Sequence, residues 1–138
     1  MDSEKAGFWL RVSALTIDEV ILVTLTFVIL YLLKAYLSMY IKSSLLFMLL
    51  FYEFLDYNYY TLFWVFGGQT PGKKILKTKV IKYDGSPLRY RDAFIRYWVW
   101  MIGIGFSGIG YFWIAFEKDK RGWNDIAAKT YVIKIVHK

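Results

Sequence analysis

Three long apolar stretches, separated by polar segments, dominate the pattern of the chain. They cover residues 14–37, 45–66 and 97–116. A helix needs about 20 apolar residues to cross the hydrocarbon core of a bilayer. The first two stretches therefore predict two spanning helices. We expect the first to be retained rather than cleaved as a signal peptide, because its apolar centre leads into Lys34 and tyrosines instead of a small-residue cleavage site.

The third stretch carries no charge, but small residues crowd its centre. Within eight positions lie Gly103, Gly105, Ser107, Gly108 and Gly110. Each glycine costs a helix about 1 kcal/mol relative to alanine. We therefore predict that 97–116 is a helical hairpin, a re-entrant pair or an interfacial element broken near these glycines. In the alternative, the small residues form the close-packed face of one straight helix.

Two short segments outside the apolar stretches have the character of β-strands. Residues 77–83 alternate loosely and meet the tight-turn signal Asp84-Gly85, and residues 130–136 are β-branched and alternating. A third stretch that crossed once would leave these strands on opposite sides of the membrane with unpaired edges. The expected fold is therefore an all-α membrane protein with two spanning helices, a returning third element and a small two-stranded β-ribbon.

The distribution of charge predicts the orientation. The 138 residues are 57% hydrophobic, more than a soluble domain of this size can bury, and carry a net charge of +7. Eight lysines and arginines fall within residues 73–96, whereas the segment between the first two stretches carries little charge. The positive-inside rule then predicts a multi-pass protein of the cell membrane with this basic segment and both termini in the cytoplasm. We expect the basic residues to meet anionic lipid headgroups rather than nucleic acid.

The composition removes several kinds of catalytic site. There is no cysteine, and the single histidine, His137, stands next to the last residue. No disulfide, thiolate metal site, histidine zinc site or catalytic triad can be built from this set. We expect no cofactor, no metal and no enzymatic activity.

A glycine-rich segment follows the second apolar stretch. Residues 67–73 (GGQTPGK) match the first seven positions of a phosphate-binding loop, G-x-x-x-x-G-K, but Lys74 replaces the Ser or Thr that would bind magnesium. We interpret the segment as a helix end at the membrane surface, with Lys73 and Lys74 contacting lipid headgroups.

Ionisable residues inside the apolar stretches are the candidate functional residues. Arg11 and Asp18 are seven residues apart, so they share one face of a helix, about 10 Å apart along its axis. Glu53 and Asp56 are neighbours on one face of the second helix. Together with Asp18 they are candidates for a proton or cation relay. Alternatively, Glu53 and Asp56 lie in a solvated dip or pair with Lys34 or Lys42.

The order of these motifs resembles the RDD family of small membrane proteins. The resemblance rests on Arg11, Asp18, residues 68–73 (GQTPGK), the turn at 80–85 and residues 121–130 (RGWNDIAAKT), and it covers about residues 8–136. It implies that the arginine and two aspartates of the family name are Arg11, Asp18 and Asp125. Asn124 departs from the histidine of many members, which argues against a titrating role there. Glu53 and Asp56 match no family motif.

The resemblance implies a function only in outline, because the family is mostly uncharacterised and is often linked to transport, including sodium/proton exchange. Our first hypothesis is a non-catalytic accessory or scaffold subunit of a membrane complex. In it, Arg11, Asp18 and Asp125 form a structural network that ties the first helix to the cytoplasmic ribbon. The alternative is a small transporter or cation/proton exchanger that works as an oligomer. Both hypotheses require other membrane chains or further copies of this one as partners.

Overall fold

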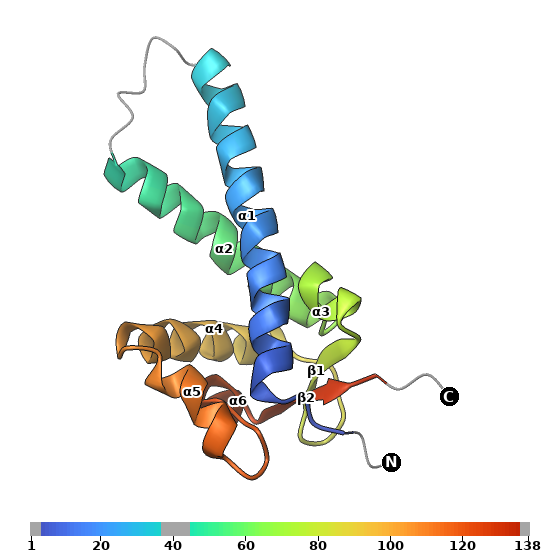
Figure 1. The fold of residues 1–138 in the computed structure, drawn as a ribbon. Helices are drawn as coiled ribbons and strands as arrows, with labels where there is room; N and C mark the ends of the chain where they lie inside the picture. Colours follow the sequence, from blue (N-terminus) through green and yellow to red (C-terminus); the bar gives the residue numbers. More distant parts are fainter. Residues whose placement is uncertain (1–3, 37–44, 136–138) are drawn as a thin grey trace.

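The computed structural model describes residues 4–36 and 45–135, so His137 and Lys42 lie outside the described residues. Six helices and two strands follow one another along the chain (Figure 1). They are α1 (Phe8–Tyr36), α2 (Leu45–Phe66), α3 (Pro71–Ile75), β1 (Thr78–Lys82), α4 (Tyr90–Gly105), α5 (Ile109–Phe116), α6 (Trp123–Ala128) and β2 (Thr130–Lys134). The fold is mostly helical with one small sheet, as the sequence predicts.

The two long helices differ in their suitability for a membrane. Helix α1 is long and apolar enough to cross one, and most of its side chains are exposed in the isolated chain. Helix α2 has 22 residues and carries Glu53 and Asp56 among its apolar residues, and it is not among the helices apolar enough to count as a candidate span. The described residues therefore contain one clear candidate span, and a second if α4 and α5 are taken as one bent span.

The third apolar stretch turns back, as its glycines predict. Helices α4 and α5 meet at an angle of 98°, with Ser107 and Gly108 in the left-handed region between them. Gly103 and Gly110 face each other across the bend so closely that a Cβ on Gly110 would lie 2.9 Å from the Cα of Gly103. The alternative of one straight helix is wrong.

The two strands pair as an antiparallel ribbon, which confirms the predicted pairing. Val80 lies opposite Val132 in the register, and both side chains are buried. The segment before α1 joins the other edge of β2, where the Lys134 amide donates to the carbonyl of Glu4 at 2.7 Å. The ribbon thereby collects three distant parts of the chain at one end of the molecule (Figure 1).

A compact core joins this end of α1 to α2, α4 and the ribbon. Its buried apolar members include Ala6, Leu22, Tyr60, Trp64, Val80, Leu88, Ala93, Tyr97 and Val132. The short helices α3 and α6, which the sequence pattern did not predict, pack around this core: α3 against α1, and α6 against α4. They carry the polar residues described next.

Candidate functional site

Asp125 is the centre of a buried ion-pair cluster. The side chain of Arg11, from α1, donates to its Oδ2 at 2.5 Å, and that of Arg96, from α4, donates to its Oδ1. The amide of Gly122 donates to Oδ2 at 2.9 Å, so Asp125 also caps its own helix. Burial alone would raise the pKa of Asp125, but the two guanidinium groups outweigh it and hold this pKa well below its usual range.

Arg11 ties the start of α1 to the tail. Besides its bond to Asp125, its Nε donates to the carbonyl of Ala6 at 3.0 Å and its Nη2 to the carbonyl of Lys120 at 2.5 Å. All three nitrogens of this guanidinium therefore have an acceptor. A buried arginine satisfied in this way fixes the position of α1 relative to the segment before α6.

Asp18 caps helix α3 rather than joining the ion pairs. The amide of Gly72 donates to its Oδ1 at 2.7 Å, and the hydroxyl of Thr70 donates to its Oδ2 at 2.5 Å. The hydroxyl of Tyr59 adds a third hydrogen bond at 2.9 Å. The carboxylate thus occupies the position where a helix N-terminus would attract an anion. A Cβ on Gly72 would lie 2.2 Å from the carbonyl oxygen of Ala14, so only glycine allows this approach.

The predicted headgroup contact of Lys73 is wrong. Its side chain is 9% exposed and points inward, with Nζ 5.8 Å from the centre of the Trp64 ring. The reason is the start of α3: Asp18 fixes this short helix against α1 with Lys73 on its inner side. Lys74, one position on, is exposed and remains available to headgroups. Burial, together with the positive charge of Arg96, lowers the pKa of Lys73 to about 8.

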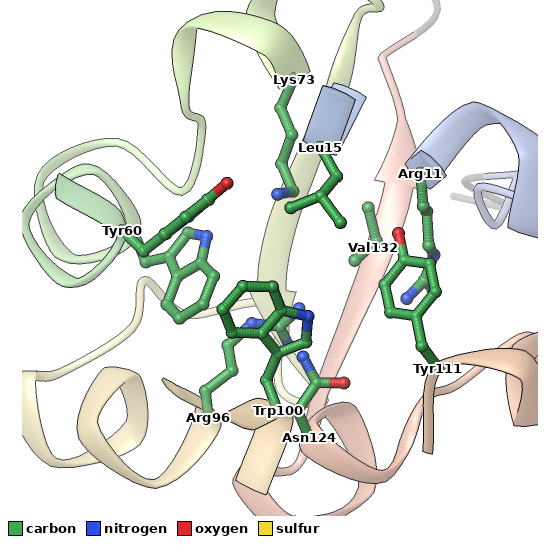
Figure 2. Close-up of a pocket in the computed structure, with 10 residues that line it drawn as sticks. Arg11, Leu15, Tyr60, Lys73, Arg96, Trp100, Tyr111, Asn124 and Val132 are labelled. Atoms are coloured by element: carbon green, nitrogen blue, oxygen red, sulfur yellow. The ribbon is translucent and has the colours of Figure 1, made fainter. Parts of the chain in front are cut away.

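Lys73 points into a small cavity between the helices. Figure 2 shows Lys73 entering from one side and Arg96, Trp100 and Asn124 on the other. The lining consists of Arg11, Leu15, Tyr60, Trp64, Lys73, Arg96, Trp100, Tyr111, Asn124 and Val132. The guanidinium of Arg96 also lies over the Trp64 ring, 5.0 Å from its centre. Three cationic side chains therefore border one small, partly open cavity.

A second group of polar residues lies in an open groove between α1, α2 and α4. Glu19, Glu53 and Asp56 line it beside Tyr52, Trp100 and Ile104. Glu19 accepts hydrogen bonds from the hydroxyls of Tyr52 at 2.5 Å and Tyr60 at 3.1 Å, and Asp56 accepts one from Tyr97 at 2.7 Å. Within residues 4–36 and 45–135, no lysine or arginine pairs with these carboxylates, and no group of acidic residues has the geometry of a metal site.

Comparison with known proteins identifies the family. The RDD family model matches residues 5–129, which is nearly the whole chain. This chain belongs to the RDD family. It is 30% identical to "Uncharacterized protein YxaI" of Bacillus subtilis (strain 168), in an alignment that covers 93% of this chain and 96% of that protein. No solved structure matches the chain. The RDD family is membrane-associated, in agreement with the apolar helix α1.

In this RDD protein the three predicted network residues form two separate clusters. Arg11 and Asp125 are in direct contact, whereas Asp18 binds α3, and no contact between Asp18 and Arg11 is formed. Of the predicted relay residues, Glu53 and Asp56 share the hydroxyl of Tyr97, at 3.3 and 2.7 Å, while Asp18 faces α3 and is not part of the groove lining. Asp18 therefore does not join the acidic groove.

Sequence reasoning missed two central residues. Arg96 was one of eight basic residues in its segment, and only its place at the very start of an apolar stretch distinguished it. Glu19 adjoins Asp18 near the start of the first apolar stretch, and it forms the α1 side of the acidic groove. In both cases the signal was a charge adjoining an apolar run.

Proposed function

We propose that this protein is a non-catalytic membrane subunit that packs against another membrane chain through its acidic groove. The observation that carries the proposal is the groove itself. Asp56 is buried with Oδ1 unpartnered, and Glu53 is exposed on the same side. Carboxylates of a membrane helix are costly against lipid and face protein or water. A partner helix that offers a basic or hydroxyl side chain would satisfy them.

We also propose how the chain is oriented in the membrane. Helices α1 and α2 cross the cell membrane, the α4–α5 pair returns, and residues 73–96 and both termini face the cytoplasm. Two features support this arrangement: the concentration of basic residues in 73–96 and the antiparallel pairing of β1 with β2, which requires both strands to lie on one side. Lys74 then meets anionic headgroups.

The groove predicts which substitution separates the chain from its partner. A tagged chain would be purified from its native membranes in mild detergent, and its co-purifying proteins compared by mass spectrometry with those of Glu53→Gln. We expect Glu53→Gln to lose one membrane protein that the parent retains. Asp84→Asn, the same chemical change at an exposed turn, serves as the control and should keep it. Identical sets for all three chains would contradict the proposal.

The same groove supports cation/proton exchange as a second candidate function. Three carboxylates without a basic partner among the described residues could bind a proton or a cation. Exchange predicts a proton-coupled cation flux in liposomes that Asp56→Asn abolishes and Asp84→Asn leaves unchanged. Reconstituted protein without flux would exclude this candidate and leave the subunit role standing.

A further inference from the structure

We propose that the cavity beside Lys73 is a binding site for a small inorganic anion of about the size of chloride. The site lies among α1 to α6 and β2, next to the acidic groove, with which it shares Leu15 and Trp100. The proposal does not depend on the proposed function. Lys73 supplies the unpaired charge, and Arg96 and Trp64 supply further donors.

Beside Tyr60, Tyr111 and Asn124, which can also accept hydrogen bonds, the cavity is bordered by three donor groups without an acceptor among the described residues. Nε of Arg96 and Nε1 of Trp64 are buried without a hydrogen-bond partner, and Nζ of Lys73 has neither a hydrogen bond nor an ion pair within the described part of the chain. All three groups can only donate. Leaving buried donors unsatisfied is costly, and an acceptor bound in the cavity would offer such donors a partner.

The balance of charge also favours an anion. Three cations, Arg11, Lys73 and Arg96, border the cavity, and the nearby anions are Asp18 and Asp125. Asp125 is shared by the two arginines, and Asp18 is occupied by three uncharged donors. Three cations against two anions leave a net charge of +1 around the cavity, and a monovalent anion would neutralise it.

The size of the cavity limits the ligand. Its free space is about 30 Å³. A single water molecule requires roughly 10–15 Å³ of such space. This free space suits a monatomic anion better than a lipid headgroup or a nucleotide phosphate.

The test measures thermal unfolding of the purified full-length chain in sodium chloride and in sodium gluconate at equal ionic strength. We expect chloride to raise the melting temperature saturably, because a ligand that binds only the folded state stabilises it. Lys73→Met should weaken the apparent chloride affinity about tenfold or more, since it removes a charged hydrogen bond. Lys74→Met is the matched control: it removes the same charge one residue away and should respond like the parent.

A second variant keeps the test decisive if Lys73→Met does not fold. Trp64→Phe retains a ring but removes the indole donor, and it should weaken the chloride affinity several-fold. Equal melting temperatures of the parent in chloride and gluconate would overturn the proposal. The proposal would also fail if Lys73→Met and Trp64→Phe were stabilised by chloride as much as Lys74→Met is. Stabilisation by phosphate equal to that by chloride would contradict the size limit.

Discussion

At the scale of single residues, Asp125 is the counter-ion of two buried arginines, Arg11 and Arg96. Replacing it by asparagine leaves two buried guanidinium groups without their counter-ion. Removing one partner of a buried ion pair typically costs about 3–5 kcal/mol. We expect Asp125→Asn to lower the free energy of unfolding by about this amount, measured by denaturant unfolding in detergent.

The control for that change is Asp119→Asn. Asp119 also forms ion pairs, with Lys5 and Arg121, but its side chain is 42% exposed. Exposed ion pairs contribute about 0–1 kcal/mol, so this variant should unfold nearly as the parent does. Equal destabilisation by the two substitutions would show that the buried ion pairs of Asp125 contribute no more to stability than those of Asp119.

The buried ammonium of Lys73 predicts a pH dependence. Its pKa falls from 10.5 to about 8 on folding, so the unfolded chain binds more protons between these values. Stability therefore rises with pH from about 8 to 10.5 through this residue and gains nothing further above that range. In gluconate, the difference in unfolding free energy between the parent and Lys73→Met should shift in favour of the parent over this window. If this difference in unfolding free energy does not change with pH, the pKa of Lys73 is not lowered on folding.

At the scale of elements, Gly72 sets how closely α3 approaches α1. Gly72→Ala would drive a Cβ into the backbone of α1 and displace the cap that Asp18 gives to α3. Overpacking of this kind costs about 1–3 kcal/mol, and we expect a lower melting temperature and a lower folded yield. Gly67→Ala, in the same turn, places its Cβ 3.9 Å from the nearest atom and should be tolerated.

The sequence predicted the elements better than their contacts. The glycines of 97–116 indicated the break between α4 and α5, and the alternation of 77–83 and 130–136 indicated the ribbon. Helix α3 was missed because five residues that include Pro71 and Gly72 carry no periodic pattern. Because α3 was not predicted, there was no reason in the sequence to treat Lys73 and Lys74 differently, although Lys73 is buried and Lys74 is exposed.

Contacts between residues far apart in the sequence are the part of the structure that sequence patterns did not predict. Arg11 and Asp125 are 114 positions apart, and only the resemblance to a family suggested that they act together. Asp18 meets Gly72 across 54 positions, a contact that helical spacing within α1 cannot indicate. Spacing along one helix suggested a shared face for Arg11 and Asp18, but the folded chain gives the two residues different partners.

At the scale of the whole molecule, the proposed topology predicts which ends of the elements are accessible from outside the cell. Because the chain has no cysteine, single cysteines can be introduced without background. We expect a cysteine at Asp84, in the ribbon turn, to react with a membrane-impermeant maleimide only after the cells are permeabilised. A cysteine at Leu45, at the opposite end of α2, should react in intact cells. Labelling of the Asp84 position in intact cells would reverse or refute the topology.

The central claim is that a second membrane chain covers the acidic groove. Its most direct test is photocrosslinking in native membranes from a photoreactive residue at Ile104, which lines the groove, compared with one at Phe27, an exposed residue of α1 that is not part of the groove lining. If a partner chain covers the groove, we expect a protein adduct of defined size from position 104 and only lipid adducts from position 27. Lipid adducts alone at position 104 would contradict it.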